Sequence, residues 1–138
     1  MKRLLVVDDA LFMRKLIGDV ASEAGWEIAG EAPNGQEAVT LYDRIRPDLV
    51  TMDLVMPIMD GLTALREIRA RDPEAQIIVV TALDQKQALM DSIQFGAIDF
   101  IVKPFERARV LALLQKLGSG ETAPTGSPIE KHRADDTA

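Results

Sequence analysis

Near its N-terminus the chain reads Leu4-Leu5-Val6-Val7-Asp8-Asp9, four aliphatic residues followed directly by two carboxylates. An unbroken aliphatic run of this length is typical of a strand that is buried on both faces of a parallel sheet. Comparable runs occur at residues 49–53, 77–80 and 100–102, and a weaker strand is predicted at residues 26–31. Longer segments separate all of these candidate strands, which favours a parallel sheet with crossover connections.

The segments between and after the strands carry apolar residues at helical spacing. We expect helices at residues 12–24, between the Pro33-Asn34-Gly35 turn and Pro47, from about residue 62 to the Asp72-Pro73 pair, at residues 85–95 and at residues 106–117. Because right-handed crossovers join parallel strands, these helices are expected to cover both faces of the sheet. The prediction is an α/β fold of the flavodoxin-like type, a doubly wound (βα)5 parallel sheet with strand order 2-1-3-4-5.

Composition divides the 138 residues into one domain and a tail. Residues 1–117 hold all the predicted strands and helices. Residues 118–138 are rich in Gly, Ser, Thr, Pro and charge, and Ile129 is their only large aliphatic side chain. Because this segment buries too little apolar surface to offset its ordering entropy, it is predicted to be a flexible C-terminal tail.

Charge and residue usage argue against several classes of protein. The net charge is −6 and no segment gathers Lys and Arg into a stripe, so direct binding to nucleic acid is not expected. The absence of cysteine excludes disulfides and thiolate metal sites. No stretch approaches the roughly 20 apolar residues that span a bilayer. We therefore expect a cytoplasmic monomer that does not associate with membranes.

Polar residues stand at the carboxyl ends of four predicted strands, namely Asp8-Asp9, Asp53, Thr81 and Lys103-Pro104. Singly, each has an ordinary alternative role as a helix cap, a turn residue or a surface lysine. In the predicted topology, however, these strand ends meet at one edge of the sheet, where a ligand crevice is expected.

The residue types gathered at this edge predict a particular chemistry. Three carboxylates brought together repel one another unless a cation holds them, and Mg²⁺ or Mn²⁺ suits a set of oxygen ligands. A hydroxyl and an ammonium group suit the oxygens of a phosphoryl group. The residues therefore predict an Mg²⁺-dependent phosphoryl site in which a carboxylate is the nucleophile.

Four separated motifs carry a family resemblance. They are Leu4-Leu5-Val6-Val7-Asp8-Asp9, Met52-Asp53-Leu54-Val55-Met56-Pro57-Ile58-Met59-Asp60-Gly61, Val80-Thr81-Ala82 and Phe100-Ile101-Val102-Lys103-Pro104-Phe105. In this order they resemble the receiver domains of two-component response regulators, and within that family the single-domain chemotaxis regulators. The resemblance covers about residues 2–117. It implies a signalling protein that is not an enzyme beyond its own phosphorylation and dephosphorylation.

The resemblance implies a role for each residue of the acidic cluster. Asp53 would be the phosphorylated residue. Asp9 would bind Mg²⁺ directly, and Asp8 would bind it largely through water. Asp53 itself and the backbone carbonyl of Val55 would complete the protein ligands, and Mn²⁺ is expected to substitute for Mg²⁺.

The resemblance also implies which residues hold the phosphoryl group. Thr81 and the backbone N–H of Ala82 would contact its oxygens, and Lys103 would pair with its charge. Asp53, Thr81 and Lys103 are thus the expected catalytic set. The Lys103-Pro104 peptide bond is expected to be cis, a form that a proline tolerates at modest cost.

A further implication of the resemblance concerns the output. The signal would leave through the face formed by residues 85–95, 100–102 and 106–117, as Thr81 moves inward and Phe100 follows it. Chemotaxis regulators often carry tyrosine at the position of Phe100, so this chain offers no phenol hydroxyl to a partner there.

The expected partners follow from the same resemblance. A phosphohistidine on a histidine kinase would be the donor, and a downstream protein, for example a flagellar motor switch protein, would be the target. Val55 and Leu83 are apolar residues flanking the site, so no side chain there orients a water molecule. We expect slow hydrolysis of the phosphorylated form, and a phosphatase is a further expected partner.

Three other functions are alternatives for a chain with this pattern. A flavodoxin-type flavin carrier would need a phosphate-binding loop where Asp8-Asp9-Ala10 stands, and these carboxylates would repel phosphate. A phosphatase of the haloacid dehalogenase group would carry its nucleophile after the first strand and usually a cap domain. A receiver from another phosphorelay, or from a longer regulator joined through residues 118–138, is the alternative within the family.

Overall fold

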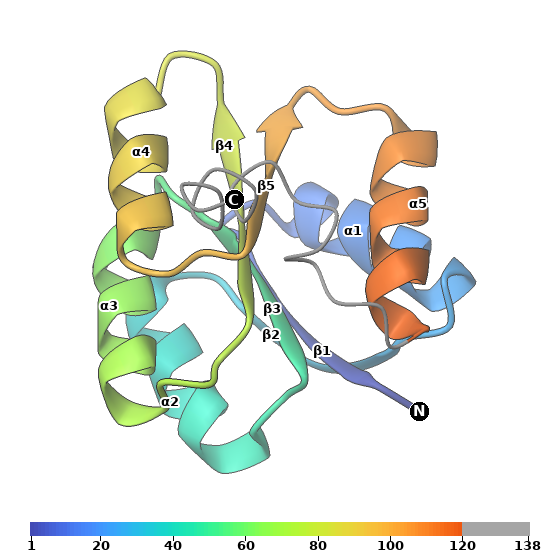
Figure 1. Cartoon of the computed structure of the whole chain (residues 1–138), viewed down its shortest axis with the longest axis horizontal. Helices are drawn as coiled ribbons and strands as arrows, with labels where there is room; N and C mark the ends of the chain where they lie inside the picture. Colours follow the sequence, from blue (N-terminus) through green and yellow to red (C-terminus); the bar gives the residue numbers. More distant parts are fainter. Residues whose placement is uncertain (120–138) are drawn as a thin grey trace, which may run out of the picture.

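Five strands form one parallel sheet at the centre of the structure, a computed structural model that describes residues 1–119 (Figure 1). They are β1 (Arg3–Val7), β2 (Glu27–Ala32), β3 (Leu49–Asp53), β4 (Ile77–Ala82) and β5 (Asp99–Lys103). Their order across the sheet is β2-β1-β3-β4-β5, and each neighbouring pair is parallel. This order confirms the predicted flavodoxin-like fold.

Five helices alternate with the strands. They are α1 (Leu11–Glu23), α2 (Gly35–Ile45), α3 (Gly61–Arg71), α4 (Lys86–Gln94) and α5 (Arg107–Gly118). The helices α1 and α5 cover one face of the sheet, and α2, α3 and α4 cover the other (Figure 1). The crossovers therefore bury the central strands on both sides, as the aliphatic runs predict.

The alternation of side chains along β1 shows how this burial works. Leu4 and Val6 belong to the core shared with α1 and α5, whereas Leu5 and Val7 belong to the core shared with α2, α3 and α4. All four side chains are essentially inaccessible to solvent. Because neither face of the strand meets water, no position favours a polar residue until the strand ends at Asp8.

The loop between β3 and α3 brings the start of α3 back to the carboxyl end of β3. The Asp60 carboxylate accepts a hydrogen bond from the backbone N–H of Thr63 (2.8 Å) and so caps α3. A Cβ atom at Gly61 would overlap the backbone carbonyl of Asp53, so only glycine allows this approach. The start of α3 therefore packs directly against the end of β3.

The boundaries of the elements agree with the predicted ones to within two residues, and those of β3 coincide. Strand β4 continues through Thr81 to Ala82, and β5 continues through Lys103, so both polar residues lie within the hydrogen-bonded ladder. The Lys103-Pro104 peptide bond is cis, as expected. Among the described residues, no helix is long and apolar enough to cross a membrane.

The predicted domain end at residue 117 lies one residue before the end of α5 at Gly118. The predicted flexible tail, residues 118–138, falls almost wholly outside the described residues and stays a prediction.

Candidate functional site

Three carboxylates meet where β1 and β3 end. Each of Asp8, Asp9 and Asp53 has a carboxylate oxygen that lies within 4.8 Å of a carboxylate oxygen of the other two. The pairing of Val7 with Met52 in the neighbouring strands brings the strand ends level, so the predicted cluster is formed by the sheet register itself. Asp8 and Asp53 are buried, at 1% and 6% exposure, whereas Asp9 faces solvent.

An ammonium group from β5 lies against the two buried carboxylates. The Nζ atom of Lys103 is 2.9 Å from Oδ2 of Asp8 and 3.6 Å from Oδ2 of Asp53. Lys103 and Asp8 are 95 positions apart in sequence, and only the sheet topology joins them. One positive charge thus offsets part of the repulsion between the carboxylates.

Backbone hydrogen bonds orient the same carboxylates. Oδ1 of Asp8 accepts from the backbone N–H of Ala10 at 2.9 Å, and Oδ1 of Asp53 accepts from the backbone N–H of Val55 at 3.3 Å. Each buried side chain therefore has a fixed direction, and its second oxygen is turned toward Lys103. Asp9 is the third carboxylate of the cluster and lies on its solvent-exposed side.

The pKa of the Asp53 carboxyl is raised from its ordinary 3.8 to about 6. Burial is the largest cause, and the charge of Asp8 adds to it. Lys103 and the Val55 N–H act in the opposite direction, and Asp9 contributes a smaller increase. The protein without a bound cation therefore holds a carboxylate that is costly to ionise.

The other predicted site residues surround this cluster. Thr81 is buried at 2% exposure and follows Val80, which pairs with Asp53 in the adjacent strand. Its hydroxyl donates to the backbone carbonyl of Ala82 at 3.2 Å, while the Ala82 residue itself is exposed. Val55 is 56% exposed at the rim.

Two residues that sequence reasoning missed support the loop after β1. The Arg14 guanidinium donates to the backbone carbonyl of Asp8 (Nη1, 2.7 Å) and to the Glu31 carboxylate (Nε, 2.9 Å). Glu31 lies near the carboxyl end of β2, beside β1. Extending the search for polar residues at strand ends to β2 would have found Glu31, whereas nothing in the helical pattern marks Arg14.

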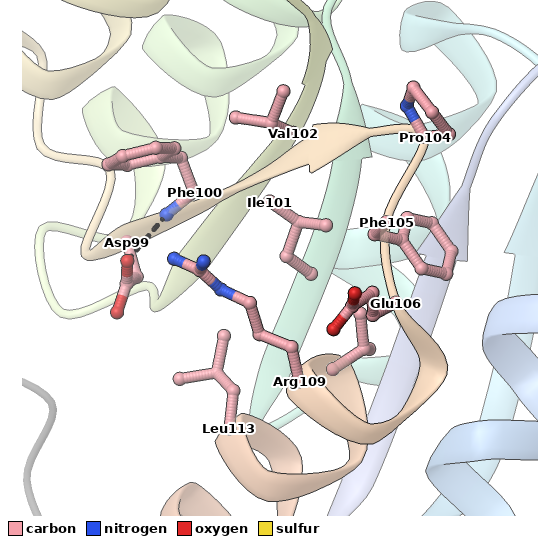
Figure 2. A pocket seen from close by; sticks show the side chains of 10 residues that line it. Asp99, Phe100, Ile101, Val102, Pro104, Phe105, Glu106, Arg109 and Leu113 are labelled. Carbon is pink, nitrogen blue, oxygen red and sulfur yellow. Dashed lines mark hydrogen bonds between the residues drawn. The ribbon is translucent and has the colours of Figure 1, made fainter.

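A cavity of about 390 Å³ lies on another part of the surface, between β5 and the start of α5. It contains the half-buried Phe100 but none of the clustered carboxylates. Figure 2 shows the Arg109 side chain reaching from α5 toward Asp99 and Phe100, whose backbone N–H donates to the Asp99 carboxylate at 2.8 Å. Burial raises the pKa of Asp99, and the nearby charge of Arg109 partly opposes that change.

The donors in the acidic cluster are all oxygens, which is the set preferred by hard divalent cations such as Mg²⁺. Asp8, Asp9 and Asp53 could hold such an ion, and its charge would relieve the repulsion between them. An ionised carboxylate, a cation and an ammonium in one partly dry site are the groups needed to accept a phosphoryl group.

Comparison with known proteins agrees with this chemistry. Residues 4–115 match the family model of the response regulator receiver domain. The chain is 51% identical over 116 residues to the chemotaxis protein CheY of Thermotoga maritima, covering 84% of this chain and 97% of that protein. It is 52% identical over 114 residues to CheY of Bacillus subtilis, covering 83% and 95%.

A solved structure shows the same fold. A chain in the crystal structure of the CheX-CheY-BeF3-Mg²⁺ complex from Borrelia burgdorferi superposes with a TM-score of 0.79 at 37% identity, covering 85% of this chain and 89% of that chain. Receiver domains are signalling modules that are phosphorylated on aspartate. With the family model matching most of its length, this chain belongs to the response regulator receiver domain family.

Proposed function

We propose that this chain receives a phosphoryl group on Asp53 from a histidine kinase in the cytoplasm and passes the signal to a target protein in chemotaxis. One observation carries the proposal most directly. The Lys103 ammonium contacts two buried carboxylates, Asp8 and Asp53, at the carboxyl edge of the sheet, so an acceptor carboxylate and a positive charge lie together there. The similarity to proteins named for chemotaxis supports the choice of pathway.

In the transfer step, an ionised oxygen of Asp53 attacks the phosphorus of a phosphohistidine. The P–N bond breaks, its electron pair returns to the imidazole nitrogen, and an acyl phosphate forms on Asp53. Asp8, Asp9, Asp53 and the carbonyl of Val55 would hold Mg²⁺, with Mn²⁺ as a substitute. The bound ion would supply neutralising charge to the phosphoryl oxygens.

Three further residues would hold the transferred group. Lys103 already lies 3.6 Å from Asp53, so its ammonium can follow the charge onto a phosphoryl oxygen. The Thr81 hydroxyl and the backbone N–H of Ala82 would donate to the other oxygens. The weak 3.2 Å bond from Thr81 to its neighbouring carbonyl is easily exchanged for a bond to a charged acceptor.

Return to the unphosphorylated state requires water to attack the same phosphorus, releasing inorganic phosphate and restoring the carboxylate. The two side chains at the rim, Val55 and Leu83, are 56% and 75% exposed and carry no polar group. Neither can orient the attacking water, so we expect slow hydrolysis unless a phosphatase supplies that group.

The output would pass through α4, β5 and α5. Movement of Thr81 toward a phosphoryl group would free space for the Phe100 ring, which is already half-buried against the core. The cavity beside Phe100 (Figure 2) lies on this face and would change shape with it. A population shift between two packings of this face would thus report phosphorylation to a target such as a flagellar motor switch protein.

The test is the intact mass of the protein after incubation with acetyl phosphate. We expect a gain of one phosphoryl group that requires Mg²⁺ and is absent in an Asp53→Asn variant. A gain that persists in that variant would show that a residue other than Asp53 accepts the phosphoryl group. No gain in folded wild-type protein would refute the proposed function.

A further inference from the structure

A second groove lies between α3 and α4, at the ends of these helices opposite to the acidic cluster. Its volume is about 500 Å³, and its lining comprises Arg66, Arg69, Ala70, Pro73, Ile93, Gln94, Phe95 and Gly96. The helices α3 and α4 lie side by side on the same face of the sheet (Figure 1). None of the residues assigned to phosphorylation or to the β5–α5 cavity takes part.

Two guanidinium groups give the groove a positive character. Within residues 1–119, neither Arg66 nor Arg69 forms an ion pair with a carboxylate, whereas four other arginines do so. Those four are Arg14, Arg46, Arg71 and Arg107. In a chain of net charge −6, two arginines without carboxylate partners in one groove form a local site for negative charge.

Both arginines are held in place by contacts other than ion pairs, and Arg66 is exposed whereas Arg69 is half-buried. The Arg66 guanidinium lies 4.4 Å above the centre of the Phe95 ring. Arg69 donates from Nη1 to the backbone carbonyl of Ala75 at 3.0 Å. A Cβ atom at Gly96, whose φ is +107°, would lie 2.6 Å from Nε of Arg69, so this glycine makes room for the arginine.

The groove also offers apolar contact and length. Phe95 is 43% exposed and forms an apolar wall beside the guanidinium groups. A neighbouring depression of about 340 Å³, lined by Thr63, Arg66, Glu67 and Ala70, shares Arg66 and Ala70 with the groove. The concave surface therefore continues across α3, where the Glu67 carboxylate favours a neutral or apolar part of an extended ligand over an acidic one.

We propose that this α3–α4 groove binds an acidic segment of a partner protein. Carboxylates of the segment would take bidentate hydrogen bonds from Arg66 and Arg69, and an adjacent apolar side chain would pack against Phe95. The chain's overall negative charge would repel an acidic segment from other parts of the surface, so the segment would dock at this groove. The proposal is independent of phosphorylation at Asp53.

The test uses a fluorescein-labelled decapeptide of aspartate and leucine, with a matched peptide in which asparagine replaces each aspartate. Fluorescence anisotropy with the full chain should show binding of the acidic peptide that weakens as salt rises. Arg66→Gln and Arg69→Gln should each raise the dissociation constant about tenfold. Arg44→Gln, which removes an exposed arginine on α2, should change it less than about twofold.

Unchanged melting temperatures and unchanged phosphorylation by acetyl phosphate would show that the variants remain folded and competent. No binding at the highest soluble concentration, equal binding of the asparagine peptide, or an equal loss in Arg44→Gln would overturn the proposal. Binding of inorganic pyrophosphate that needs the same arginines, without binding of the peptide, would also overturn it and assign the groove to a small phosphate ligand.

Discussion

Replacing Asp53 by asparagine should stabilise the protein when no divalent cation is present. Asparagine keeps the shape of the carboxyl group and an oxygen to accept from the Val55 N–H, but it carries no charge to repel Asp8. The raised pKa of Asp53 measures the cost of that charge in the folded state. It rises from 3.8 to about 6, which corresponds to about 3 kcal/mol when the group is fully ionised.

The gain in stability depends on pH because it requires Asp53 to be ionised. Well below pH 3.8, Asp53 is protonated in the folded and unfolded chains, and it contributes no difference in stability. Well above pH 6 it is ionised in both, and the full penalty applies to the folded wild-type protein. We expect Asp53→Asn to gain about 3 kcal/mol at pH 8 and about half of that at pH 5.

Urea unfolding in EDTA, followed by the fluorescence of the single tryptophan, Trp26, measures this gain. Trp26 is buried and donates to the backbone carbonyl of Leu114, so its signal reports global unfolding. Glu74→Gln is the matched control, because it removes one exposed negative charge in the turn before β4, at the other edge of the sheet. Excess Mg²⁺ should stabilise the wild type more than Asp53→Asn and so reduce the difference.

Three results would contradict a charge penalty at Asp53. One is an Asp53→Asn variant no more stable than wild type at pH 8 in EDTA. Another is a gain of the same size at pH 5 and pH 8, since repulsion that depends on ionisation must fade as Asp53 is protonated. The third is an equal gain in Glu74→Gln, which would assign the effect to net charge alone.

Further substitutions test the site and its support. Lys103→Gln removes the ammonium that contacts Asp8 and Asp53, so the rate of phosphorylation by acetyl phosphate should fall at least about tenfold; an unchanged rate would contradict the role of Lys103. Val55→Asn places a polar group at the rim and should shorten the half-life of the phosphorylated protein in a phosphate-release assay, whereas an equal or longer half-life counts against the slow-hydrolysis argument. Asp60→Ala removes the cap of α3 and should cost about 1 kcal/mol in urea unfolding, while Asp60→Asn, which keeps a capping oxygen, should change stability by less than about 0.5 kcal/mol.

Much of this protein could be predicted from local patterns because the fold and the site depend on the same feature of the chain. A strand buried on both faces must be continuously apolar, and its polar residues can begin only where it ends. The four motifs therefore mark both the strands and the edge at which the chemistry gathers. This is why local patterns place Asp8, Asp53, Thr81 and Lys103 together.

Some features depended on packing between elements far apart in the chain. Local patterns in the sequence predict the five strands and the residue types at their ends, and the length and number of elements suit the flavodoxin-like strand order. Three contacts could not be predicted in this way. Lys103 lies closer to Asp8 than to Asp53. Arg14 donates to the Asp8 carbonyl, and Arg66 stacks on Phe95. The physical reason is that a side chain's partners depend on register, burial and rotamer across neighbouring elements, and the periodicity of one segment carries no information about them.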